Sequence, residues 1–158
     1  MWLDNQGTLR VAKNYISNAG NDYAEYRKSK NNEKIEAGRV VIENGDGTLS
    51  LCSKRLERGC EVVSDTYGTI LYEMEGNNLP IAITGRVLAY PDKDKNSFLI
   101  GHPVCSGENG TVSMMSEEEE RLYPSRIIGV VSEIPNYDYW DNGNEKVAVK
   151  DRIWIRIK

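Results

Sequence analysis

Turn-forming residues divide this chain into many short segments, and their spacing limits the folds that it can adopt. Asn-Gly-Asp-Gly occupies residues 44–47, and glycine and asparagine recur together at 75–78 and 107–110. Asn-Gly and Asp-Gly pairs favour β-hairpin turns because these residues tolerate positive φ angles. With turns about every 8–12 residues and roughly ten short strands between them, the sequence predicts an all-β sandwich or barrel.

The segments between the turns have the patterns of strands. Residues 146–157 alternate most clearly, with Ile153, Ile155 and Ile157 on one side and Trp154 among basic residues on the other. Residues 60–64 and 69–73 are expected to form two strands across a turn at 65–68. Gly85, inside the apolar run 79–90, indicates a bulge or a close backbone contact.

One short helix is predicted within this β-rich pattern. Ser116 precedes four glutamates, and Glu119 stands three residues after it, as in a capping box. Acidic residues in a first turn also suit the helix dipole. Pro124 limits the helix to about two turns. The acidic run is therefore interpreted as a helix start rather than a metal site.

Length and charge exclude several classes of protein. At 158 residues the chain predicts one main domain, and a net charge of −4 without a cluster of basic residues argues against nucleic-acid binding. No apolar run approaches the length of a membrane span, and no signal peptide is visible. We therefore expect neither nucleic acid nor a membrane as a partner.

The three cysteines, Cys52, Cys60 and Cys105, form no metal-binding or redox motif. They are expected to be reduced and mostly buried thiols, and a disulfide between Cys52 and Cys60 is the alternative.

The sequence contains few of the residues and motifs that conventional enzymes use for catalysis. His102 is the only histidine, which argues against most Ser/His and Cys/His sites, and we expect it to have a structural or surface role. There is no Gly-rich phosphate loop and no zinc-ligand spacing, so no metal and no cofactor are predicted.

The junction at residues 17–26 is the remaining candidate for chemistry. Small and flexible residues lead up to Asn21, and the carboxylates Asp22 and Glu25 follow among tyrosines. Before the junction, residues 8–16 alternate like a short strand at the end of a β-rich shaft. We therefore divide the chain into an upstream shaft segment or linker at 1–21 and a main domain at 22–158.

The motif D-Y-A-E-Y at residues 22–26 resembles the start of the self-cleaving C-terminal chaperone domain of phage tail-spike, or neck-appendage, proteins. The resemblance implies a mainly β homotrimer that is made in the bacterial cytoplasm, assembles into the virion tail, and contacts the upstream shaft of the same protein. It also implies cleavage between Asn21 and Asp22, with Asp22 and Glu25 as the acting carboxylates. Weaker similarities follow at residues 38–41, 85–87 and 128–132.

Strand geometry constrains how these carboxylates act. Residues three apart on a strand point to opposite faces, so Asp22 and Glu25 of one chain converge on one bond only if the backbone bends. The alternative is a trimer in which Asp22 of the cut chain meets Glu25 of a neighbouring chain. We expect Glu25 to activate water or the attacking group and Asp22 to engage the scissile carbonyl, as in a single-turnover autoprotease of the glutamic-peptidase kind. At least one carboxyl should then have a raised pKa.

The size of the barrier adds a requirement for assembly. One proton-transfer group increases a reaction rate by about 10²–10⁴, and amide cleavage needs a larger increase. Precise positioning in a folded trimer provides the rest, because well-oriented intramolecular reactions reach effective molarities of about 10⁵–10⁸ M. In a rival route, the side-chain nitrogen of Asn21 attacks its own carbonyl carbon and cyclises.

Two other functions compete with self-cleavage. The first is a non-cleaving trimeric receptor-binding or adhesin tip that contacts a glycan, and the second is a conventional hydrolase that acts on separate substrates. The aromatic loop at residues 137–142 is expected to pack between subunits, with a plain surface loop and ligand binding as alternatives.

Overall fold

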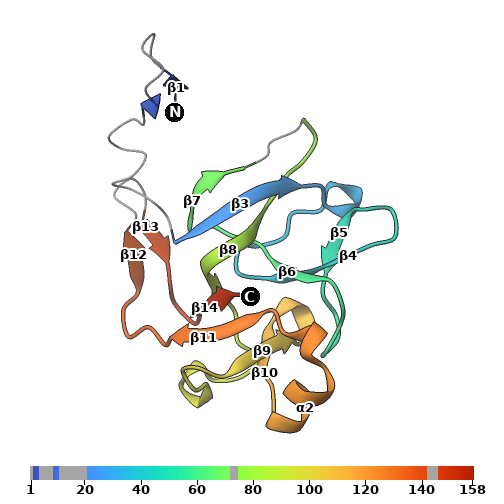
Figure 1. The fold of residues 1–158 in the computed structure, drawn as a ribbon, viewed down its shortest axis with the longest axis vertical. Coiled ribbons are helices and arrows are strands. Elements are labelled where there is room, and N and C mark those ends of the chain that lie inside the picture. Colours follow the sequence, from blue (N-terminus) through green and yellow to red (C-terminus); the bar gives the residue numbers. More distant parts are fainter. Residues whose placement is uncertain (1, 4–8, 11–20, 72–74, 142–145) are drawn as a thin grey trace.

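The computed structural model describes residues 2–3, 9–10, 21–71, 75–141 and 146–158. These residues form an all-β, sandwich-like fold with one short α-helix, which confirms the predicted fold class (Figure 1). Of the predicted upstream strand at residues 8–16, the structure describes only Leu9–Arg10, which is β2 and pairs with β1 (Trp2–Leu3); the remainder lies outside the described residues.

The largest sheet has seven strands in the order β10-β9-β11-β14-β8-β3-β7. In chain order these strands are β3 (Asp22–Arg27), β7 (Tyr67–Ile70), β8 (Leu79–Ala89), β9 (Pro103–Ser106), β10 (Val112–Met114), β11 (Gly129–Glu133) and β14 (Ile153–Ile157). A three-stranded sheet contains β4 (Val40–Glu43), β5 (Leu49–Leu51) and β6 (Cys60–Val62), and β12 (Tyr139–Asp141) pairs with β13 (Lys146–Ala148) in an antiparallel two-stranded sheet. The turn predicted at residues 44–47 lies between β4 and β5, which are paired in antiparallel fashion.

Strand β8 joins the two halves of the large sheet. Its residues 79–85 pair with β3, and its residues 86–89 pair with β14. Gly85 stands at the change of partner with φ of +103°, and the register against β3 shifts nearby. The predicted irregularity at Gly85 is therefore confirmed.

Backbone pairing also closes a ring through β3, β5, β4, β6 and β8. The Leu49 amide donates to the Lys28 carbonyl at 2.9 Å, just beyond β3, and the Ser64 amide donates to the Pro80 carbonyl of β8 at 2.8 Å. This ring has its own apolar cluster of buried side chains: Val41, Leu49, Val63, Leu79 and Ile81.

The main core lies on the other face of β4 and β6. Val40 and Val62 pack there with Val87, Ile153 and Ile155 from β8 and β14. Neighbouring residues of these strands belong to different apolar clusters, so these strands are buried on both faces. A strand that is buried on both faces contributes more apolar surface to the core than a strand with one face in solvent.

The predicted face of isoleucines on β14 is confirmed, but the opposite face of this strand is also covered. Trp154 is fully buried in a third cluster with Leu88 and Val147, and its ring meets Trp140 edge-on at 5.5 Å. The loop that we expected to pack between subunits therefore places Trp140 and Tyr137 against its own chain, while Tyr139 is exposed.

The helix α2 (Glu117–Leu122) begins as predicted. The Ser116 hydroxyl accepts from the Glu119 amide at 3.2 Å, and the Glu119 carboxylate accepts from the Ser116 amide at 2.9 Å. Four short 3₁₀ turns lie between the described strands: Lys30–Asn32, Lys95–Ser97, Glu108–Gly110 and Pro124–Arg126.

One predicted connection was wrong. The two predicted strands correspond to β6 and β7, with residues 72–73 outside the described residues, but these strands are not neighbours across a turn, because β7 pairs in parallel with β3 instead of with β6. Residues 63–66 carry the chain from β6 to β7, and this crossing places Thr66 beside the start of β3.

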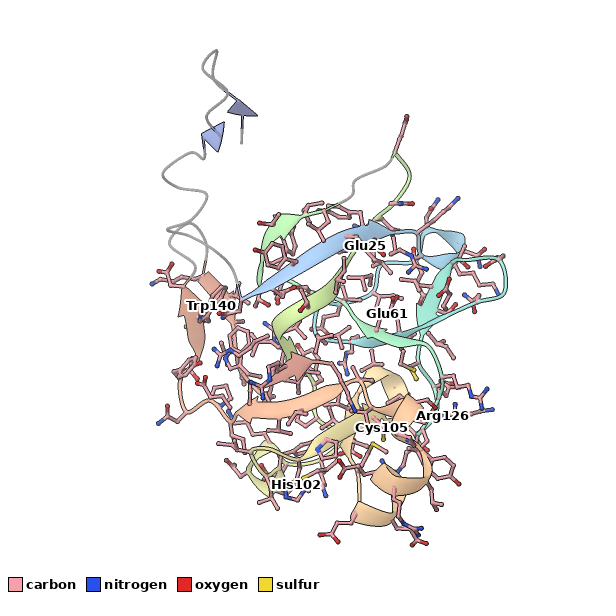
Figure 2. The ribbon with its side chains drawn as sticks, viewed as in Figure 1. Glu25, Glu61, His102, Cys105, Arg126 and Trp140 are labelled. Atoms are coloured by element: carbon pink, nitrogen blue, oxygen red, sulfur yellow. The ribbon has the colours of Figure 1, made fainter. Side chains whose placement is uncertain are left out.

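The three cysteines are free thiols, as predicted, with Cys52 and Cys105 buried and Cys60 half-buried. The Cys52 and Cys60 sulfurs are 3.8 Å apart and are not bonded. His102 is exposed at the surface (Figure 2). No described helix is long and apolar enough to cross a membrane.

Candidate functional site

Asp22 is a buried carboxylic acid at the first position of β3. The residue is 3% exposed, and its Oδ1 atom accepts a hydrogen bond from the Thr66 hydroxyl at 2.8 Å. The Thr66 amide in turn donates to the Ser64 hydroxyl oxygen at 3.0 Å. The crossing from β6 to β7 thus supplies a small buried polar shell around this carboxyl group.

Burial raises the pKa of Asp22 from 3.8 to about 6. The hydrogen bonds from Thr66 and Ser64 act in the opposite direction, and the negative charge of Asp65 adds to the increase. The raised carboxyl pKa expected at this junction is therefore found at Asp22. The group changes protonation state close to neutral pH, which is the range that suits a proton-transfer residue.

The main chain of Asn21 is hydrogen-bonded at both its amide and its carbonyl group. The Asn21 amide donates to the Thr66 carbonyl at 2.9 Å, and the Arg86 amide donates to the Asn21 carbonyl at 2.6 Å. A donor that faces a carbonyl oxygen stabilises negative charge that develops on it. The carbonyl of the predicted scissile bond therefore has one preorganised donor.

Gly85 brings the backbone of β8 directly against this peptide bond. A Cβ atom at position 85 would lie 2.3 Å from the Asn21 carbonyl oxygen and 2.7 Å from the Asp22 Cα atom. Only glycine fits such an approach, and only glycine adopts a φ of +103° without strain. The close contact inferred from Gly85 is thus with the junction itself.

Two buried polar atoms at the junction have no hydrogen-bond partner. They are Asn21 Nδ2 and Asp22 Oδ2, and they make up half of the four such side-chain atoms in the described part of the chain. Unsatisfied buried polar groups are destabilising and rare in native proteins. Their placement on the two residues that flank one peptide bond marks this bond as unusual.

Glu25 lies on the other face of β3. Buried Ala24 stands between it and Asp22 on the alternating strand, and the Glu25 carboxylate is 3.7 Å from the Arg27 guanidinium. No contact between the Asp22 and Glu25 carboxyl groups is present in the described structure. One chain alone therefore does not bring the two predicted catalytic residues together, and a contribution of Glu25 from a neighbour stays a prediction.

Arg27 is shared by three glutamates. Besides Glu25, its guanidinium lies 3.0 Å from the Glu43 carboxylate and 3.4 Å from the Glu61 carboxylate. Burial raises the pKa of Glu61, while the charge of Arg27 lowers it and the charges of Glu43 and Glu25 raise it further. The Glu25 face of β3 is thus a charged and partly solvated network.

A groove of about 290 Å³ borders this network. Figure 2 labels Glu25 on β3 and Glu61 on β6, which line the groove together with Ile83, Ile127 and Lys158. Ile83, the residue skipped in the pairing of β8 with β3, is 40% exposed. Acidic and apolar side chains meet in this groove, away from the Asn21–Asp22 bond.

Several residues at the junction were not identified from sequence. Ser64 lies at the end of a predicted strand and Thr66 in a predicted turn, neither of which indicates a contact with Asp22. The amide of Arg86 has no sequence signature because it is a backbone group. Gly85 was the one signal for this side of the site. In the described residues no group of three or more His, Cys, Asp or Glu side chains is arranged to hold a metal ion.

No protein-family model matches the sequence, and no curated protein matches it. Among solved structures, the N base of head fiber gp8.5 of bacteriophage phi29 is similar, with 12% sequence identity and a TM-score of 0.41. The similarity covers 78% of this chain and 85% of that chain. A similarity of this extent supports no conclusion about function.

Proposed function

We propose that this chain is a module of a phage tail-spike or related appendage, and that it cuts itself once between Asn21 and Asp22. The proposal rests on the motif at residues 22–26 and on one structural observation: the carboxyl group with the raised pKa of about 6 belongs to a residue of the bond itself. It is buried there, beside a carbonyl that already accepts a backbone hydrogen bond.

The residues of the junction supply two parts of a cleavage reaction. The Arg86 amide stabilises the charge that develops on the Asn21 carbonyl oxygen. Asp22 in its protonated form is placed to give a proton to the leaving amine, which is its own main-chain nitrogen. The pairing of β3 with β7 and β8 holds the junction in one geometry. This positioning supplies the part of the rate increase that a single proton-transfer group does not.

In this proposal the module acts as a homotrimer and an intramolecular chaperone. It aligns three chains in the bacterial cytoplasm, and the cut then separates residues 1–21 from residues 22–158. Glu25 reaches the junction of a neighbouring chain, which makes the cut depend on assembly. The module belongs to the virion tail, next to the upstream shaft of the same protein.

A non-cleaving tip or adhesin module is the second candidate. It is favoured by the hydrogen bonds that tie the amide and carbonyl groups of Asn21 to Thr66 and Arg86. Such bonds also suit a junction that stays intact and fixes the direction of the chain as it enters β3.

The test is the intact mass and the oligomeric state of the purified full chain over time. Loss of residues 1–21 supports self-cleavage, and Asp22→Asn and Glu25→Gln are expected to slow it at least 100-fold. Glu43→Gln is the matched control, because it removes another carboxylate from Arg27 and is expected to cut at the parent rate. A full-length trimer that stays uncut would favour the second candidate, and an uncut monomer would overturn both.

A further inference from the structure

We infer that the nucleophile at this junction is the side-chain nitrogen of Asn21, so that the chain is cut by cyclisation of Asn21 and not by water. This inference rests on the proposed self-cleavage. It assigns to Asn21 a catalytic role in place of the attack by water that the pair of carboxylates implies.

The surroundings of Asn21 favour an internal nucleophile. Its Nδ2 atom is buried and donates to no acceptor, so no hydrogen bond has to be broken before it moves. Asp22 is 3% exposed, and the backbone of β8 packs directly against the Asn21–Asp22 peptide bond at Gly85. A water molecule needs access to the carbonyl carbon, whereas the Asn21 side chain is already attached to the same residue.

Ring closure has a large advantage of proximity. Attack of Nδ2 on the Asn21 carbonyl carbon closes a five-membered ring, and well-oriented intramolecular reactions reach effective molarities of about 10⁵–10⁸ M. The Arg86 amide, 2.6 Å from the Asn21 oxygen, stabilises the oxyanion that forms. Asn21 Nδ2 and Asp22 Oδ2 are not hydrogen-bonded to each other in the structure. The Asn21 side chain must therefore rotate before Nδ2 can pass a proton to Asp22.

Asp22 completes the proton balance. Its carboxylate accepts a proton from Asn21 Nδ2 as the new C–N bond forms. It then gives this proton to its own main-chain nitrogen as the Asn21–Asp22 bond breaks. Its pKa of about 6 suits both steps near neutral pH. No water, oxidant or metal is consumed, and the products are a succinimide at the end of residues 1–21 and a free amine on Asp22.

Glu25 is not needed for this chemistry in the same chain. Its carboxylate lies on the opposite face of β3, where it is paired with Arg27 at 3.7 Å. Its predicted role across a trimer, to activate the attacking group, belongs to the Glu25 of a neighbouring chain, and Glu25→Gln tests that role separately from Asn21→Ala.

The test follows the fragment of residues 1–21 by mass spectrometry at early times, with and without hydroxylamine. A fragment that is one water lighter than the free acid, and that hydroxylamine converts to a hydroxamate, supports cyclisation. Asn21→Ala is expected to slow cutting at least 100-fold. Asn21→Gln, which retains an amide but must close a larger ring, is expected to be slowed as well.

The outcomes separate this inference from the proposed function. An uncut parent overturns self-cleavage and the inference with it. A parent that releases only the free acid at early times, together with Asn21→Ala that cuts at the parent rate, overturns the inference and leaves self-cleavage standing. Thermal unfolding of both variants shows whether they fold; if Asn21→Ala does not, Asn21→Gln and the hydroxylamine product decide the question.

Discussion

The two faces of β3 hold two carboxylic acids three residues apart in opposite environments. Asp22 is nearly inaccessible, accepts neutral hydroxyl hydrogen bonds, and has its pKa raised by burial. Glu25 has a side chain that is 32% exposed and lies near a guanidinium that two other glutamates share. The comparison shows that the protein stabilises charge on one face and opposes it on the other, although the two residues belong to one short motif.

The largest expected effect comes from closing the space beside Asp22. Gly85→Ala places a methyl group within 2.3 Å of the Asn21 carbonyl oxygen, and backbone atoms are on both sides of the clash. We expect a loss of about 2–4 kcal/mol in the free energy of unfolding, measured by denaturant titration.

Gly47→Ala is the matched control for that prediction. Gly47 also has a positive φ, +79°, but nothing lies within 4 Å of the added methyl group. Backbone strain alone should cost about 1–2 kcal/mol. If the two variants lost equal stability, the close packing of β8 on the junction would have no energetic consequence.

The second effect is a dependence on pH that Asp22 alone should produce. Its folded pKa of about 6 is above the ordinary value of 3.8, so the folded state binds the proton more tightly than the unfolded state. The resulting stabilisation is fully present below about pH 3.8 and is lost as the pH rises through about 6; the full difference corresponds to about 3 kcal/mol.

Asp22→Asn should remove this dependence. We expect the variant to be about 2 kcal/mol more stable than the parent at pH 8 and about 1 kcal/mol less stable at pH 3.5, since the new amide adds an unpaired donor that costs about 1 kcal/mol at every pH. Urea titrations across this pH range measure the difference. The free energy of unfolding of the parent should fall between pH 4 and pH 7 relative to that of the variant. If it does not, burial does not oppose the charge of Asp22.

The smallest effect is expected on the other face. Glu25→Gln removes one partner of Arg27 at 3.7 Å, while Glu43 and Glu61 remain at 3.0 and 3.4 Å. A partly exposed ion pair of this kind contributes less than about 0.5 kcal/mol, so the unfolding free energy should hardly change. A loss above about 1.5 kcal/mol would show that the two faces are energetically more alike than their burial indicates.

Local signals in the sequence predicted local structure well. The Asn-Gly-Asp-Gly turn, the capping box of α2 and the isoleucine face of β14 each depend on residues that are neighbours in the chain. Gly85 was also identified, because a glycine within an apolar strand is itself a sequence signal of close approach.

Long-range pairing was not predictable from the same patterns. Nothing in residues 60–73 specifies that β7 leaves β6 and pairs in parallel with β3, since the choice depends on how the whole sheet packs. The hydrogen bond from Thr66 to Asp22 spans 44 positions and follows from that choice. The motif located the junction, but only the fold shows that one of its carboxyl groups is buried and the other is not.

The position of β3 between two partner strands has a mechanical consequence. Its hydrogen bonds to β7 and β8 run across the strand, while Asn21 leaves along it. Tension applied through Asn21 therefore loads these bonds in shear, all at once, and they resist it collectively instead of opening one after another. Breaking the bond just before Asp22 removes the load from the strand in a single event and leaves the sheet itself unstretched.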